Sequence, residues 1–157
     1  MKVAIYSRVL EQDQQKDVQL LFDELEKESI IPVVFEPLFA ELKKFISLPP
    51  SCLTFSDHTD LNQDIDFVIS LGGDGTLLDT VTLIRDKRLP VVGINFGRLG
   101  FLASIGRNEM TDAVNDSVNH AQIEAFPQTV TGKICQRINN ITVVEFINSP
   151  FITQNLR

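Results

Sequence analysis

Residues 67–76 read Phe-Val-Ile-Ser-Leu-Gly-Gly-Asp-Gly-Thr, and this stretch decides the fold class. Its apolar start predicts a buried strand, which runs directly into a glycine-rich turn. After the turn, Leu77, Val81 and Ile84 recur on one side of a helical pattern that starts at Thr76. A turn between a strand and a helix lies at the carboxyl end of that strand, where open α/β sheets bind their ligands.

The same alternation of strand and helix runs through residues 1–124. Apolar runs predict strands, and apolar residues spaced three or four apart predict helices. We expect strands at 2–6, 31–35, 53–55, 90–94 and 101–103, and helices over 18–25, 38–46 and 110–121. The second of these helices is expected to stop at Pro49-Pro50. This order predicts an α/β domain with a parallel sheet flanked by helices.

Residues 125–157 show a different pattern. Apolar residues between 134 and 147 are scattered among polar ones, which indicates one or two strands without partners. We expect this segment to be the incomplete start of a second, β-rich domain. Its exposed strands would seek a partner by dimerisation or edge pairing.

Composition bounds the class of protein. The 157 residues are 43% apolar and 22% charged, which is typical of globular chains and excludes a wholly disordered one. A net charge of −7 argues against a nucleic-acid partner. No apolar run suits a membrane span or a signal peptide, so we expect a cytoplasmic protein. Cys52 and Cys135 show no metal-ligand spacing, and no protein metal site is predicted.

The glycine turn carries the chemistry. Gly72, Gly73 and Gly75 allow positive φ and close approach of a ligand to the backbone. The N–H groups and positive dipole end of the following helix attract phosphate, and Thr76 can add a hydroxyl or cap the helix. Asp74 has two interpretations: it caps the helix, or it is a general base that takes a proton from an attacking hydroxyl. Neither a Walker A sequence nor a strict G-x-G-x-x-G is present.

A second glycine-rich loop follows the next predicted strand. Residues 93–102 read Gly-Ile-Asn-Phe-Gly-Arg-Leu-Gly-Phe-Leu, and in a parallel sheet they face the same crevice as the first turn. Asn95 can hydrogen-bond a ligand and Arg98 can neutralise phosphate. Phe96 or Phe101 can flank a flat base. In the alternative interpretation the glycines only serve turns and Phe101 belongs to the core.

Charge around the turn is one-sided. Residues 45–84 contain no Lys or Arg, whereas Asp57, Asp60, Asp64, Asp66, Asp74 and Asp79 all lie there. A bound polyphosphate therefore needs backbone N–H groups, a divalent cation or Arg98. From this we predict a requirement for Mg²⁺ or another divalent cation. The acidic residues at 57, 60 and 64 are expected to form a solvated loop, and a carboxylate at 79 would repel phosphate.

The two loops together resemble the signatures of the NAD kinase family, over about residues 1–124. The resemblance implies phosphoryl transfer from ATP or polyphosphate to the 2′-hydroxyl of the adenosine ribose of NAD, which gives NADP. It implies that Asp74 is the base and that family members assemble as homo-oligomers. It also implies that Phe101 lines the adenine pocket, with Asn95 and Phe96 nearby, and that the phosphate- and ribose-contacting turn comprises Gly72, Gly73, Gly75 and Thr76.

The resemblance has limits and leaves alternatives. The family's second domain carries an Asn-Glu or Asn-Asp signature that residues 125–157 lack, since Asn148 precedes Ser149 and Asn155 precedes Leu156. We therefore expect weak or absent kinase activity from residues 1–157 alone. A lipid kinase of the diacylglycerol or sphingosine type shares the first signature but not the second. A non-catalytic nucleotide-binding module is the other alternative, and the choices of ATP or polyphosphate and of NAD or NADH stay open.

Overall fold

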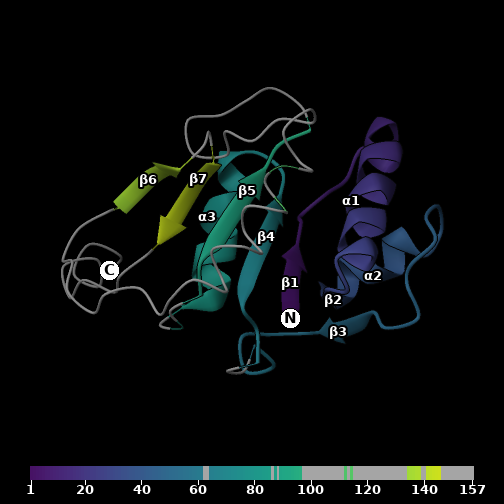
Figure 1. Cartoon of the computed structure of the whole chain (residues 1–157), viewed down its shortest axis with the longest axis horizontal. Helices are drawn as coiled ribbons and strands as arrows, with labels where there is room; N and C mark the ends of the chain where they lie inside the picture. Colours follow the sequence, from purple (N-terminus) through teal and green to yellow (C-terminus); the bar gives the residue numbers. More distant parts are fainter. Residues whose placement is uncertain are drawn as a thin grey trace.

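The computed structural model describes residues 1–61, 64–85, 87, 89–96, 112 and 114, and the backbone of 134–138 and 141–145. Within these residues the strands form one sheet in the order β3-β2-β1-β4-β5-β7-β6 (Figure 1). The strands are β1 (Lys2–Tyr6), β2 (Ile31–Phe35), β3 (Leu53–Phe55), β4 (Phe67–Leu71), β5 (Val91–Ile94), β6 (Ile134–Ile138) and β7 (Ile141–Glu145). The helices are η1 (Gln12–Gln14), α1 (Gln15–Lys27), α2 (Glu36–Leu42) and α3 (Asp74–Ile84).

Strands β1 to β5 run parallel, as the sequence predicts. From β1 the chain builds outward through β2 to β3, then returns to the other side of β1 with β4 and continues to β5. The strand order therefore reverses between β1 and β4. In open α/β sheets the crevice outside the carboxyl ends of strands at such a reversal is the usual place for a ligand.

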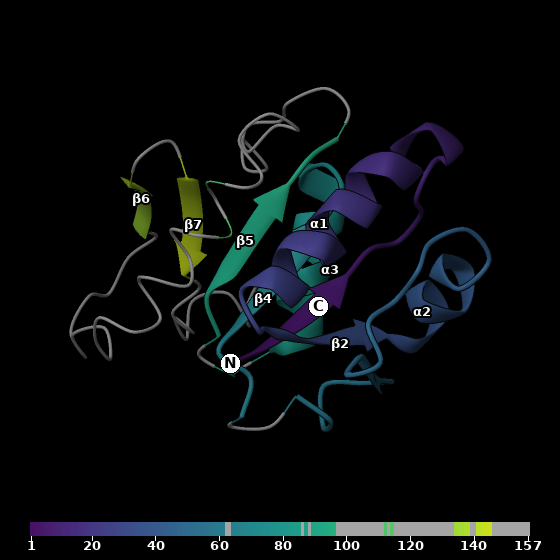
Figure 2. The same cartoon turned by 45° about the vertical axis from the view of Figure 1, so that its right-hand side comes forward.

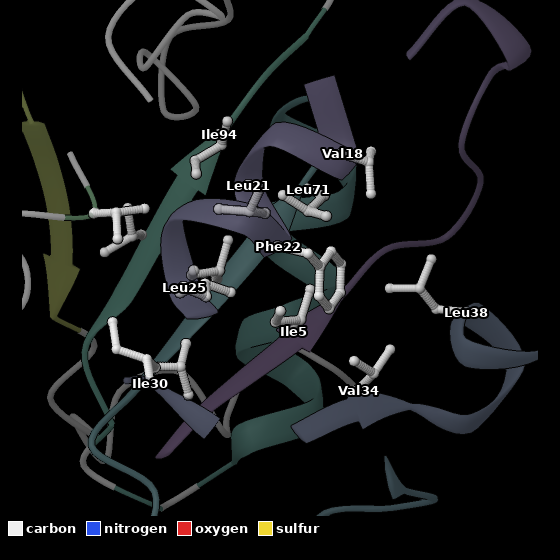
Figure 3. Close-up of a cluster of buried hydrophobic side chains, with 14 of the residues drawn as sticks. Ile5, Val18, Leu21, Phe22, Leu25, Ile30, Val34, Leu38, Leu71 and Ile94 are labelled. Carbon is white, nitrogen blue, oxygen red and sulfur yellow. The ribbon is translucent and has the colours of Figure 1, made fainter. Parts of the chain in front are cut away.

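Helices cover both faces of the sheet. In Figures 1 and 2, α1 lies over one face and α3 over the other. On the α1 side, Leu21, Phe22 and Leu25 pack on residues of the sheet that include Leu71 and Ile94 (Figure 3). On the other side, Leu77 and Ile84 of α3 pack with Ala4, Val68 and Val91. These two apolar layers fix the sheet between the helices and hold the strand ends in place.

Two helix boundaries differ from the prediction. The prediction that the helix over 38–46 stops at Pro49-Pro50 is wrong, because α2 already ends at Leu42. The N–H groups of Phe45 and Ile46 both donate to the carbonyl of Leu42, so the chain continues in turns that press these two side chains against the core. Helix α3 begins at Asp74, two residues before the predicted start at Thr76. Thr80 is buried in this helix, whereas the spacing predicted burial of its neighbour Val81.

The two strands predicted between 134 and 147 are present as β6 and β7. They are not without partners: they pair with each other, and β7 lies antiparallel against β5. The boundary between residues 124 and 125, and the second domain beyond it, stay predictions. Asp112 and Val114 are helical, whereas the strand predicted at 101–103 lies outside the described residues. Among the described helices, none has the length and hydrophobicity that crossing a bilayer requires.

Candidate functional site

The glycine turn is held at its entrance by both strands that flank β4. The hydroxyl of Ser7, one residue past β1, donates to the carbonyl of Leu71 at 2.7 Å, and this bond is buried. The N–H of Gly72 donates to the carbonyl of Ile94 in β5 at 2.9 Å. The peptide that joins Leu71 to Gly72 is therefore bonded at both of its polar atoms. This fixes the direction in which the chain leaves the sheet.

The turn then folds tightly upon itself. Gly72 has φ +141°, a conformation that residues with a side chain rarely adopt. A Cβ at Gly72 would stand 2.6 Å from Oγ1 and 3.0 Å from Cβ of Thr76. The side chain of Thr76 therefore packs directly over the Gly72 backbone, and only glycine leaves room for it. The sequence predicts positive φ in this turn, and the structure assigns it to Gly72.

Helix α3 begins with a glycine at its N-cap. Gly73 has no side chain to accept from the first N–H groups, so the N-cap residue makes no side-chain hydrogen bond. Asp74 is the first helical residue, one place after the N-cap, and its two interpretations, helix capping and general base, both stay predictions. The N–H groups at a helix start and the positive end of the helix dipole favour an anion at this end.

Open space and a second strand end complete the site. A Cβ at Gly75 would meet no atom within 4 Å. Asn95, the residue after β5, lies beside the turn, because its Nδ2 is 3.6 Å from the place that a Cβ of Gly73 would occupy. Phe96 is 7% exposed and packs in the core on the α1 side, so little of its surface is open to a base. Its role stays a prediction, and Arg98 and Phe101 lie outside the described residues.

A cation that the sequence analysis missed lies beside α3. Nε of Arg8, from the segment after β1, is 2.6 Å from Oδ2 of Asp79. The negative charge at Asp79 is therefore paired within the chain. The contact pairs two charges without hydrogen-bond geometry, and Oδ2 is buried. The sequence places these two residues far apart, and only the adjacency of β1 and β4 could have indicated that they meet.

The surroundings of this pair are partly buried. Burial and the neighbouring charge of Asp79 both raise the pKa of Tyr6, and Arg8 acts in the opposite direction. The Tyr6 ring packs 5.1 Å from the ring of Phe35, centroid to centroid. On the core side of α3, the Thr80 hydroxyl lies 2.9 Å from the hydroxyl of Ser70 and also 2.9 Å from the carbonyl of Thr76, the last residue of the turn. Thr80 therefore ties the backbone at the end of the turn to β4.

The acidic loop before β4 has a structural role. Asp57 accepts from the N–H and hydroxyl of Thr59, and these bonds lower the pKa of Asp57. Asp60 accepts from the N–H and hydroxyl of Ser56, with the same effect on its pKa. Both aspartates are solvent-exposed and build turns, which agrees with the expected solvated loop. Within the described parts of the chain, no three His, Cys, Asp or Glu side chains gather as a metal site.

Comparison with known proteins identifies the family. A family model described as the ATP-NAD kinase N-terminal domain matches residues 51–123, which contain both the glycine turn and Asn95. An NAD kinase of Cytophaga hutchinsonii is 39% identical over 120 residues, which are 76% of this chain and 41% of the relative. The chain belongs to the NAD kinase family. An NAD kinase of Bacteroides fragilis is 34% identical over 125 residues, 79% of this chain and 42% of its own length.

The fold is also that of a solved relative. A crystal structure of yeast NADH kinase complexed with NADH matches with a TM-score of 0.64 and 20% sequence identity. It covers 76% of this chain and 38% of the yeast protein, and at this identity it shows the fold. The chain thus spans about two fifths of the length of the NAD kinases that it matches.

Proposed function

We propose that this chain provides the phosphate-binding and catalytic half of an NAD kinase. The reaction is transfer of a phosphoryl group from ATP or polyphosphate to the 2′-hydroxyl of the adenosine ribose of NAD, which gives NADP. One observation carries the proposal. The Gly72–Thr76 turn stands at the reversal of the strand order, where a helix start with a glycine N-cap, open space at Gly75 and the carboxylate of Asp74 occur together.

Each residue of the turn has a distinct part in the proposal. The backbone of Gly72, Gly73 and Gly75 and the hydroxyl of Thr76 contact phosphate and ribose. Asp74 accepts the proton of the 2′-hydroxyl as that oxygen attacks the terminal phosphorus, and the bond to the departing phosphate breaks. Positioning and charge neutralisation supply most of the rate enhancement in such transfers.

The second loop completes the nucleotide site in this proposal. Asn95 hydrogen-bonds the ligand from beside Gly73. Phe101 lines the adenine pocket, with Phe96 contributing from its edge, and Arg98 neutralises phosphate. The acceptor is NAD or NADH, the enzyme works as a homo-oligomer, and neither nucleic acid nor a membrane takes part. A cytoplasmic location agrees with the intracellular supply of ATP.

A divalent cation would enter the site bound to the phosphates of the phosphoryl donor. Mg²⁺ in phosphoryl-transfer sites is commonly held by one or two carboxylates and by the phosphates themselves. The phosphate oxygens of the donor would hold Mg²⁺ beside the turn, and its chemistry would be to neutralise the charge of the transferring group. The protein's own residues place the hydroxyl and accept its proton.

The test uses the purified chain at a concentration above that of NAD, so that a single slow turnover is detected. The chain is mixed with NAD, radiolabelled ATP and MgCl₂, and labelled NADP is separated and counted. We expect labelled NADP from the unmodified chain, and a rate about 10²–10⁴-fold lower from Asp74→Asn, the usual contribution of a general base. Asp74→Asn should still bind ATP in a calorimetric titration, which shows that the fold is intact.

Three outcomes would contradict the proposal. Label in diacylglycerol or sphingosine in place of NAD would indicate a lipid kinase. Binding of ATP with equal, background amounts of label in NADP from the chain and from Asp74→Asn would indicate a non-catalytic binding module. Undiminished NADP formation in excess EDTA would refute the role of the divalent cation.

A further inference from the structure

The segment that follows β1 is fixed against the glycine turn by two neighbouring residues. Ser7 donates its hydroxyl to the carbonyl of Leu71, immediately before Gly72. Arg8 places its guanidinium on Asp79 in the second turn of α3. One contact is a hydrogen bond to backbone and the other is an ion pair to a side chain. Two independent contacts thus hold the end of β1 at the strand reversal, beside the end of β4.

The position of Asp79 places Arg8 next to the phosphate-binding backbone. Asp79 lies four residues after Gly75 and three after Thr76. Residues three and four apart on a helix are surface neighbours. The guanidinium of Arg8 therefore stands over the same face of α3 that carries Gly75, where a Cβ would meet no atom within 4 Å.

The contact with Asp79 orients the guanidinium of Arg8 without occupying all of its N–H donors. The contact with Asp79 is made at Nε, and the Arg8 side chain is 62% exposed. Among the residues that the structure describes, no hydrogen bond engages its terminal nitrogens. These nitrogens form the edge of the fork that matches two oxygens of a phosphate.

The segment that forms the glycine turn lacks positive side chains, so a side-chain cation for bound phosphate must come from elsewhere in the chain. No Lys or Arg occurs between residues 45 and 84, so the segment that forms the turn brings no positive side chain of its own. We propose that Arg8 binds the phosphoanhydride chain of the phosphoryl donor, with Asp79 holding the guanidinium in place. This inference rests on the proposed function and assigns to it a phosphate-binding residue from outside both glycine-rich loops.

The test compares binding of ATP and of inorganic tripolyphosphate to the purified chain by calorimetric titration with MgCl₂ present. Arg8→Gln removes the positive charge, and Arg8→Lys keeps the charge but loses the planar fork. The matched control is Lys44→Gln. Lys44 is 63% exposed and pairs with Glu41 at 2.7 Å beyond the end of α2, so the control removes one equally exposed, paired positive charge elsewhere.

We expect Arg8→Gln to raise the Kd of both ATP and tripolyphosphate by about tenfold or more, the range of a charge-assisted hydrogen bond. Arg8→Lys should have a smaller effect, and Lys44→Gln should change Kd by less than about twofold because exposed distant charges are screened. Equal effects of Arg8→Gln and Lys44→Gln would overturn the inference alone. A loss of ATP affinity without a loss for tripolyphosphate would also overturn it. Absence of ATP binding to the unmodified chain would overturn the proposed function as well.

Discussion

Substitution of Gly72 by alanine tests how strictly the turn depends on a bare backbone. The residue has φ +141°, and holding a non-glycine residue in such a region costs on the order of 1–3 kcal/mol. The new Cβ would also lie 2.6 Å from Oγ1 of Thr76, far inside the usual contact distance of about 3.5 Å. Overpacking of this kind costs about 1–3 kcal/mol. Together we expect Gly72→Ala to lower the free energy of unfolding by about 2–6 kcal/mol.

The two contributions can be separated. Thr76→Ala removes Oγ1 and Cγ2 but keeps the Thr76 Cβ, which would still lie 3.0 Å from the new methyl group. The steric part of the Gly72→Ala penalty should therefore shrink in the Thr76→Ala background, while the backbone part is unchanged. A double-mutant cycle should show a coupling of about 1 kcal/mol or more between the two positions, since they are in contact.

Gly75→Ala is the matched control in the same turn. Gly75 lies in α3, has no positive φ, and a Cβ there meets nothing within 4 Å. Alanine in a helix is more favourable than glycine by up to about 1 kcal/mol, so Gly75→Ala should leave stability unchanged or raise it. Urea unfolding followed by circular dichroism gives the midpoint for each variant. A midpoint for Gly72→Ala equal to that of Gly75→Ala would refute the reasoning.

Other predictions follow from the same geometry. Ser7→Ala leaves the buried carbonyl of Leu71 without its donor and should cost about 1–3 kcal/mol in urea unfolding, and an unchanged midpoint would contradict this. Gly75→Ala should weaken ATP binding in calorimetry because its methyl group fills the space left for phosphate; unchanged affinity would place the ligand elsewhere. Burial raises the pKa of Cys52 to about 11, so in Cys135→Ser its alkylation by iodoacetamide should stay slow until the pH approaches 11. Because the folded pKa is raised above the ordinary thiol value of 9.0, this thiol should also make stability fall as the pH rises above about 9, and a flat profile would count against it.

The sequence predicted most of the sheet because its strands are short apolar runs between strong breaks. The ranges predicted at 2–6, 31–35 and 53–55 coincide with β1, β2 and β3. The face of α1 formed by Leu21, Phe22 and Leu25 is buried as its spacing indicates. Such patterns predict strands and buried helix faces directly, because the periodicity of apolar side chains determines which face of a helix or strand packs against the core.

Helix ends were harder to predict, for a physical reason. Phe45 and Ile46 continue the apolar spacing of α2, yet they contact the core from turns beyond its end at Leu42. Burial requires only that a side chain reaches the core, and both a helix and a turn can satisfy this. Spacing alone therefore could not distinguish a longer helix from a helix followed by turns. The start of α3 was missed similarly, since Gly75 weakens the helical signal in its first turn.

The candidate site was predicted as far as it is local in the sequence. Glycine spacing indicated the turn, and the strand before residue 95 indicated that Asn95 comes to the same edge, where it lies beside Gly73. The charge argument failed at one point, because it treated the acidic segment as if its neighbours in sequence were its neighbours in space. Asp79 was expected to repel phosphate, whereas in the fold it holds Arg8.

The order of the strands explains why the sequence alone did not predict the contact between Arg8 and Asp79. A parallel strand at the start of the chain can take any place in a sheet, and apolar runs carry no information about which place it takes. Here β1 pairs with both β2 and β4, so the end of β1 comes beside the turn after β4. The residues just past β1 then lie beside the turn proposed to bind phosphate, and Arg8 would supply a positive charge that residues 45–84 lack. In this fold the reversal of strand order brings together a glycine turn and a side-chain cation that lie far apart in the sequence.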